Sequence, residues 1–280
     1  MTNAHTYLTA LRWGEDQLQV TSADSVAAQY LLLESHQWSF TQLVQHYREL
    51  MPSVEWETYQ KQIARIAAGE PAQYVLGQAP FYGRDFRVTS ATLIPRQETE
   101  ELVAWILDDV VASDLHVLDV GTGSGAIAVT LKAERPEWTV TATDISAAAV
   151  AVARENATTQ HADIQFEVGD LLAPVAGQRF DVIVSNPPYI DRSETAVMDD
   201  SVKRFEPDQA LFAADHGLAF YQRFAATLAQ YLTPNGQFFA EIGYRQGAAV
   251  RAIFETALPA ATVTIRQDIN GQDRMVRVQL

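Results

Sequence analysis

The sequence contains no cysteine among its 280 residues. This absence excludes disulfide bonds, cysteine-ligated zinc, iron–sulfur clusters and thiolate nucleophiles. Basic charge is scarce as well, because 20 Lys and Arg residues stand against 35 Asp and Glu residues and give a formal net charge of −15. A protein that neutralises many phosphates usually carries a basic face, so this balance argues against direct binding of nucleic acid.

Long hydrophobic runs are also missing. No stretch approaches the roughly 18 apolar residues that a membrane-spanning helix needs, and residues 1–18 lack the basic start and apolar core of a signal peptide. The histidines show no spacing typical of metal ligands, so we predict no metal site. Hydrophobic residues nevertheless make up 48% of the chain, which is typical of a packed core. We therefore expect a cytoplasmic protein that makes no contact with a membrane.

The hydrophobic period changes along the chain. Within residues 1–75, apolar residues recur at spacings of three and four, which predicts a helical domain. Residues 76–95 contain glycine and proline followed by a short alternating stretch, which predicts a β-hairpin linker. From residue 96 to residue 280, strand-like and helix-like segments alternate. Such alternation predicts an α/β domain in which helices cover both faces of a parallel sheet.

The strands of this sheet are predicted from short apolar runs bounded by turn residues. Two runs near the C-terminus flank the turn at residues 270–272, which predicts an antiparallel hairpin at the end of the sheet. The predicted strands cover residues 116–121, 138–145, 164–170, 180–186, 236–242, 262–269 and 273–280.

A glycine-rich loop follows the first strand of the sheet. It contains Gly121, Thr122, Gly123, Ser124 and Gly125, and glycine at alternate positions lets a ligand approach the backbone closely. The spacing differs from that of dinucleotide enzymes, and no lysine follows to hold a triphosphate. An ordinary glycine-rich turn is the alternative interpretation.

Two acids follow the next two strands. Asp144 ends the second strand, where a carboxylate can accept both hydroxyls of a ribose. Asp170 ends the third strand, and we predict that it lies near an adenine, although a solvated acid is the alternative. The loop and these acids together predict S-adenosylmethionine as the cofactor, because that molecule presents an adenosine but no pyrophosphate.

The fourth strand ends in Asn186, Pro187, Pro188 and Tyr189. The side-chain oxygen of Asn186 and the carbonyl oxygen of Pro187 can accept the two hydrogens of a planar amino or carboxamide nitrogen and orient it for methyl transfer. Pro187 has a fixed φ and is therefore stiff, while Tyr189 offers a flat wall for a planar group. The motif predicts an amino-group N-methyltransferase that needs no strong general base. A simple turn after a strand is the alternative interpretation.

Several motifs in a fixed order resemble a known family. The match runs from about residue 69 to the C-terminus, and the resemblance is to the HemK/PrmC protein-(glutamine-N5) methyltransferases. Two positions depart from the family pattern, because Gln97 replaces a proline and Glu70 replaces an arginine. The motifs are GEPAQYVLGQAPFYGRDFRV, TLIPRQETEELV, VLDVGTGSGAIAV, DVIVSNPPYI, RFEPDQALFAADHGLAFY and GQDRMVRVQL.

The resemblance implies a fold, a substrate and a set of site residues. The fold is that of a class I S-adenosylmethionine-dependent methyltransferase, with a seven-stranded, mostly parallel sheet, a C-terminal antiparallel hairpin and a small N-terminal helical domain that recognises the substrate. The substrate is the glutamine of the Gly-Gly-Gln motif in class-I peptide chain release factors. The resemblance also implies that Leu171 flanks the adenine and that residues 186–189 hold the glutamine side chain. The implied contacts of S-adenosylmethionine are Gly121, Thr122, Gly123, Ser124, Gly125, Asp144 and Asn186.

Four further residues have two interpretations each. Arg96, Glu98 and Glu206 have a function by the resemblance alone, and each has an ordinary structural interpretation as well. Phe81, in the predicted hairpin, either covers the cofactor or belongs to the core.

Three alternative functions stay open at this point. The first is a glutamine methyltransferase that acts on a ribosomal protein. The second is an N6-adenine methyltransferase of nucleic acid, because such enzymes share the Asn-Pro-Pro-Tyr motif, although a charge of −15 is unfavourable. The third is a non-catalytic module that binds S-adenosylmethionine. We expect a monomer.

Overall fold

The computed structural model describes residues 5–280, and these residues form two compact units. The first unit contains the chain up to Gln78 together with Asp199–Phe205. The second unit contains Ala79–Met198 and Glu206–Leu280. The first unit therefore includes a short helix, α9, that the chain contributes from far downstream.

The first unit is helical, as the sequence predicts. Its longest helix, α4, begins directly after Pro52, a residue that favours the start of a helix. The side chain of Thr6 accepts a hydrogen bond from the Thr9 N–H and so caps the first turn of α1. Tyr59 donates a hydrogen bond to the Ala28 carbonyl from within the hydrophobic core. The helices are α1 (Tyr7–Val20), α2 (Val26–His36), α3 (Phe40–His46), α4 (Ser53–Ala67), α5 (Ala72–Leu76) and α9 (Asp200–Phe205).

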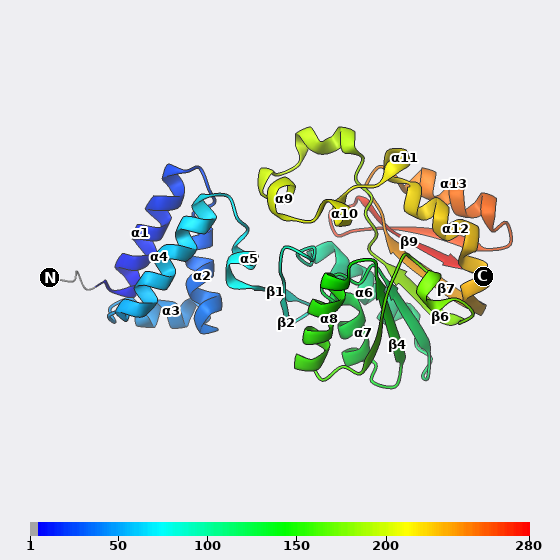
Figure 1. Ribbon diagram of the computed structural model, residues 1–280, viewed down its shortest axis with the longest axis horizontal. Coiled ribbons are helices and arrows are strands. Elements are labelled where there is room, and N and C mark those ends of the chain that lie inside the picture. Colours follow the sequence, from blue (N-terminus) through cyan, green and yellow to red (C-terminus); the bar gives the residue numbers. More distant parts are fainter. Residues whose placement is uncertain (1–4) are drawn as a thin grey trace. The chain divides into compact units, whose positions relative to one another are not determined.

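The second unit begins with a short hairpin and continues as an alternation of strands and helices (Figure 1). The hairpin consists of β1 (Gln78–Phe81) and β2 (Arg84–Arg87). The strands of the large sheet are β3 (His116–Val120), β4 (Thr139–Asp144), β5 (Ile164–Val168), β6 (Phe180–Ser185), β7 (Leu232–Glu241), β8 (Thr262–Gln267) and β9 (Asp273–Gln279). The α-helices are α6 (Gln97–Asp109), α7 (Ala126–Glu134), α8 (Ala147–Thr159), α10 (Asp208–Leu211), α11 (Ala214–Gly217), α12 (Ala219–Tyr231) and α13 (Gly247–Ala257), and the 3₁₀ turns are η1 (Ala173–Val175) and η2 (Arg192–Val197).

The strand order of the large sheet is β5-β4-β3-β6-β7-β9-β8. All neighbouring pairs are parallel except those that involve β9, which runs antiparallel to β7 and to β8. The predicted seven-stranded sheet with a C-terminal antiparallel hairpin is therefore confirmed. The helices that connect the parallel strands cover both of its faces, as expected for parallel pairing.

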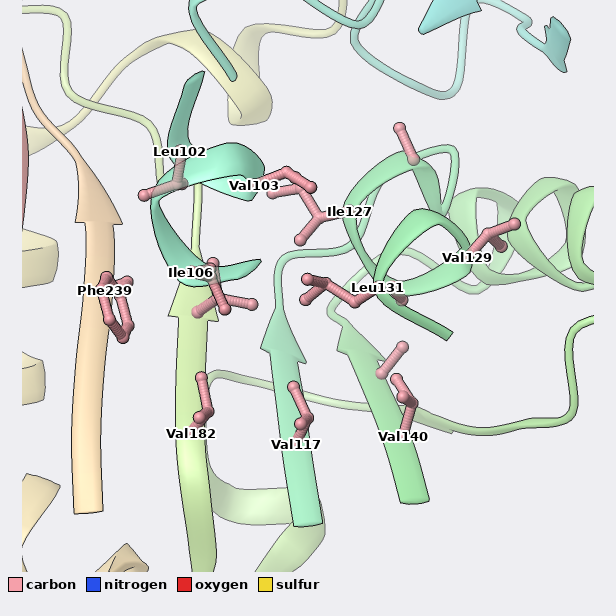
Figure 2. Close-up of a cluster of buried hydrophobic side chains, with 14 of the residues drawn as sticks. Leu102, Val103, Ile106, Val117, Ile127, Val129, Leu131, Val140, Val182 and Phe239 are labelled. Atoms are coloured by element: carbon pink, nitrogen blue, oxygen red, sulfur yellow. The ribbon is translucent and has the colours of Figure 1, made fainter. Parts of the chain in front are cut away.

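Figure 2 shows the core on one face of the sheet. Side chains from four neighbouring strands, among them Val117 and Val182, face the apolar sides of α6 and α7. The residues that alternate with them, such as Leu118 and Ile183, belong to the core under α12 and α13. Because successive side chains of a strand point to opposite faces, a strand with two buried faces reads as one continuous apolar run.

One predicted boundary differs clearly from the structure. The sequence predicts that the fifth strand begins at Gly236, but β7 begins at Leu232. The register between β6 and β7 shifts between Phe180 and Val182, so the segment before Gly236 is absorbed as an irregularity at the edge of the pairing. Asn235 adopts a φ of 67°, a conformation that asparagine tolerates better than most residues. A turn-like sequence therefore lies inside a strand.

Candidate active site

A pocket lies at the carboxyl ends of β3, β4 and β6. The chain runs from β3 outward to β5 and then returns to the other side of β3 with β6, so the strand order reverses there. Open parallel sheets bind ligands at such a point because the connecting loops diverge from it. The pocket and the solvent-open space at its mouth together have a volume of about 1050 Å³. The predicted site residues that line it are Gly121, Thr122, Gly123, Ser124, Asp144, Asp170, Leu171, Asn186, Pro187 and Pro188, whereas Gly125 and Tyr189 do not line it.

The glycine loop has the backbone conformation that its sequence predicts. Gly121, Gly123 and Gly125 all have positive φ, which glycine adopts without steric cost. A Cβ added at Gly121 or Gly123 would meet no atom of residues 5–280 within 4 Å, so both positions leave open space beside the pocket. A Cβ added at Gly125 would lie 3.1 Å from the Cβ of Ala153, because α8 packs closely against the loop. Gly125 is therefore a packing position.

Asp144 fixes the loop through its carboxylate. Its Oδ2 accepts a hydrogen bond from the Gly123 N–H at 2.9 Å, and its Oδ1 accepts one from the Ser146 N–H at 2.8 Å. Burial raises the pKa of Asp144, and the hydrogen bonds from these backbone groups oppose the rise. Each carboxylate oxygen has a further lone pair. The side chain can therefore accept hydroxyl groups from a ligand while it holds the loop.

Asn186 lies at the tip of β6, beside the end of β3. The hydroxyl of Ser185 donates to the Val120 carbonyl at 2.7 Å and ties the two strand ends together. The Nδ2 of Asn186 donates to the Thr99 hydroxyl at 2.9 Å. Its Oδ1 makes no hydrogen bond to residues 5–280, so an acceptor oxygen is available at the pocket. This arrangement can orient a donor N–H group of a ligand.

Tyr189 has a partner outside the pocket. Its hydroxyl donates to Oε1 of Glu241 at 2.8 Å, and its carbonyl accepts from Nε2 of Gln246 at 2.9 Å. Burial and the nearby Glu241 carboxyl raise the pKa of Tyr189 well above its usual value. The phenol is therefore a hydrogen-bond donor that holds the end of the motif in place.

Asp170 and Leu171 follow β5 and Asn186 follows β6, so they line the pocket from different ends of the strand order β5-β4-β3-β6. Asp170 forms an ion pair with Arg223 at 2.5 Å, with about half of each side chain exposed. Leu171 has a φ of 48°, an uncommon conformation for a leucine. The carbonyl of Leu171 accepts a hydrogen bond from the Thr143 hydroxyl at 3.3 Å. The end of β4 therefore supports this strained turn.

The residues with ambiguous roles are also located. Arg96 lines the pocket and pairs at 2.5 Å with Glu206, whose side chain is only 1% exposed. Glu98 lies in the first turn of α6, where an acid is favourable. Phe81 lines the pocket and is also part of the core, so its two interpretations are not exclusive.

Three residues at or beside the site were not predicted from the sequence. Thr99 lines the pocket and accepts from Asn186, and Glu241 accepts from Thr99 and from Tyr189. Asp119 is fully buried two residues before the glycine loop. Asp119 and Glu241 could have been recognised, because each is an acid inside an apolar strand, in VLDVG and in FFAEIG. A buried acid needs specific partners.

Residues 5–280 contain neither a candidate metal site nor a candidate membrane-spanning helix. No group of His, Asp and Glu side chains within that range could hold a metal ion. In the same range, no helix is long and apolar enough to cross a membrane.

The fold and the site define a methyltransferase. The family model of the methyltransferase small domain matches residues 99–206. A methyltransferase from Pyrococcus furiosus has a similar fold, with a TM-score of 0.54 and 16% identity over 79% of this chain and 96% of that chain. A second family model, the PrmC N-terminal domain, matches residues 9–77.

Close relatives narrow this class. A release factor glutamine methyltransferase of Enterococcus faecalis is 43% identical over 97% of this chain and 98% of its own length. One of Lactococcus lactis is 46% identical over 83% of this chain and 86% of its own length. The chain belongs to the release factor glutamine methyltransferase family. The resemblance seen in the sequence is therefore confirmed.

Proposed function

We propose that this protein transfers a methyl group from S-adenosylmethionine to the side-chain amide nitrogen of the glutamine in the Gly-Gly-Gln motif of class-I peptide chain release factors. Membership of the family supports the reaction and the substrate class. The observation that carries the assignment to this site is that Oδ1 of Asn186, a residue that lines the pocket, accepts no hydrogen bond from residues 5–280 and lies beside a glycine loop that leaves room for a ligand.

The residues around the pocket fit S-adenosylmethionine. The positions of Gly121 and Gly123 are open where a Cβ would project, and the backbone can therefore approach a ligand closely. Asp144 retains acceptor capacity for ribose hydroxyls. Asp170 and Leu171 line the far part of the pocket, where the adenine would lie. The bound cofactor supplies a methyl group that its sulfonium has already activated.

The chain's own residues would orient the acceptor nitrogen. The lone pair of a carboxamide nitrogen is delocalised, so the nitrogen must become pyramidal to attack. Its two N–H groups donate to Oδ1 of Asn186 and to the carbonyl of Pro187, which fixes the direction of the lone pair. Pro187 has no N–H and a restricted φ, which keeps this carbonyl in position. The methylated amide then loses a proton to water without a general base.

The helical first unit would recognise the release factor. It is compact by itself, and the PrmC N-terminal domain model matches most of it. Several large apolar side chains of this unit are exposed and could contact a partner. They are Val20, Val26, Phe40, Val44, Leu50 and Val54. We also propose that the protein acts as a monomer and does not bind nucleic acid directly, which its net charge of −15 supports.

Mass spectrometry of a class-I release factor tests this function. The release factor is incubated with the enzyme and S-adenosylmethionine, and we expect one glutamine, that of Gly-Gly-Gln, to gain the mass of one methylene group. A release factor with that glutamine replaced by asparagine is the control and should gain nothing. Methylation of a ribosomal protein or of a DNA oligonucleotide, with none on the release factor, would overturn the proposal in favour of one of the alternatives.

A further inference from the structure

Glu241 is a buried acid that does not line the pocket. It ends β7, its exposure is 2%, and the neighbouring residues Ala240 and Ile242 are fully buried. An acid in such surroundings is costly unless its oxygens are hydrogen-bonded. Glu241 therefore needs a reason to be there beyond the packing of the sheet.

The two carboxylate oxygens of Glu241 contact different elements. Oε2 accepts a hydrogen bond from the Thr99 hydroxyl of α6 at 2.7 Å. Oε1 accepts one from the Tyr189 hydroxyl at 2.8 Å. The backbone is held as well, because Tyr221 of α12 donates to the Glu241 carbonyl at 2.8 Å. The carboxylate is thus a fixed acceptor between α6 and the segment that follows β6.

The hydrogen bond from Thr99 to Glu241 determines how Thr99 contacts Asn186. A hydroxyl has one hydrogen, and Thr99 donates it to Glu241, so only its lone pairs face Asn186. These lone pairs accept from Nδ2 of Asn186. A flipped Asn186 amide would turn Oδ1 towards an oxygen that has no hydrogen to give, which leaves both acceptors unsatisfied. The buried acid therefore determines which atom of Asn186 faces the pocket.

We propose that Glu241 is a positioning residue for methyl transfer. It holds Asn186 indirectly, through Thr99, and it holds Tyr189 by a direct hydrogen bond. Oδ1 of Asn186 is thereby presented to the substrate amide. This inference rests on the proposed function, because it assigns Oδ1 to the acceptor nitrogen of the glutamine. It predicts that Glu241 affects the chemical step more than the binding of the cofactor.

Four variants test the proposal in the release factor assay. Glu241→Gln preserves the shape but replaces one acceptor oxygen with a donor NH2 group. Thr99→Val removes the acceptor for Asn186 with little change in volume, and Thr99→Ser restores the hydroxyl. Thr130→Val is the matched control, because Thr130 is also a buried threonine but its hydroxyl has no hydrogen-bond partner among residues 5–280.

We expect kcat to fall about 10- to 100-fold in Glu241→Gln and in Thr99→Val. The Kd for S-adenosylmethionine, measured by calorimetry, should stay within about twofold of the wild type. Thr99→Ser should recover kcat to within about threefold, and Thr130→Val should match the wild type. A residue with only a structural role would not separate kcat from cofactor binding in this way. Thermal unfolding checks each variant, and Thr99→Val carries the test if Glu241→Gln does not fold.

The outcomes separate this inference from the proposed function. A wild-type enzyme that does not methylate the release factor would overturn both. An active wild type together with folded Glu241→Gln and Thr99→Val variants that retain their kcat would overturn the positioning role alone. Equal losses in kcat and in cofactor affinity, with no recovery in Thr99→Ser, would also refute it, because they indicate general damage to the pocket.

Discussion

Asp119 makes the stability of the second unit depend on pH. This side chain of β3 is fully buried, and its Oδ2 accepts hydrogen bonds from the Thr122 hydroxyl at 2.6 Å and the Ala128 N–H at 3.2 Å. Its Oδ1 has no partner within residues 5–280. Burial raises the pKa of Asp119 from 3.8 to about 7, although the two hydrogen bonds act in the opposite direction and Asp144 adds to the rise.

The sign of the effect follows from proton linkage. The folded protein binds this proton more tightly than the unfolded chain, so the contribution of Asp119 to stability decreases as pH rises from about 4 to about 7 and is constant above that. One pKa unit corresponds to about 1.4 kcal/mol, so the ionised carboxyl lowers the free energy of unfolding by about 4 kcal/mol at neutral pH. Most of this loss, about 3 kcal/mol, develops between pH 5 and pH 8.

The variant Asp119→Asn should remove this dependence, because its amide does not ionise. Urea unfolding of the wild type and the variant without cofactor, followed by circular dichroism at pH 5 and pH 8, measures the difference in free energy of unfolding. We expect the difference in free energy of unfolding, variant minus wild type, to be about 3 kcal/mol larger at pH 8 than at pH 5. Asp163→Asn makes the same chemical change at an exposed position and should follow the wild type. A difference between Asp119→Asn and the wild type that is equal at both pH values would refute the reasoning.

Three further predictions concern the pocket and the glycine loop beside it. Asn186→Ala should bind S-adenosylmethionine normally but lose roughly 10²–10³-fold in kcat, because a preorganised acceptor is removed; wild-type turnover in the release factor assay would contradict this role. Asp144→Ala should raise the KM for S-adenosylmethionine, since it removes the acceptor for the ribose and the partner of the Gly123 N–H. An unchanged KM would count against Asp144. Gly125→Ala should destabilise the fold by about 1–3 kcal/mol in thermal unfolding, because its φ is 83° and its Cβ would press on Ala153. A variant as stable as the wild type would show that α8 can move aside.

The architecture was predictable because it depends on local periodicity. Alternating strands and helices indicate a parallel sheet, and the turn at residues 270–272 indicates the antiparallel hairpin of β8 and β9. The place of Asp199–Phe205 in the first unit was not predictable, because this short segment has no pattern that names its packing partner. The early start of β7 was missed for a similar reason, since Pro234 and Asn235 resemble a turn and only pairing with β6 includes them in the strand.

The candidate site also contains residues that could be identified from the sequence and contacts that could not. Gly121, Gly123 and Asn186 could be named from the sequence because each acts within a few residues of a strand end, where short-range sterics and the end of pairing determine the backbone. The contacts of Glu241 with Thr99 and of Thr99 with Asn186 join residues that lie 142 and 87 positions apart in the chain. Such contacts depend on the register of β7 and on the packing of α6 against the sheet. The sequence alone therefore determined which groups this protein has for binding and transfer, whereas tertiary structure decided how they are oriented, because a hydrogen bond needs its two atoms at a defined distance and angle.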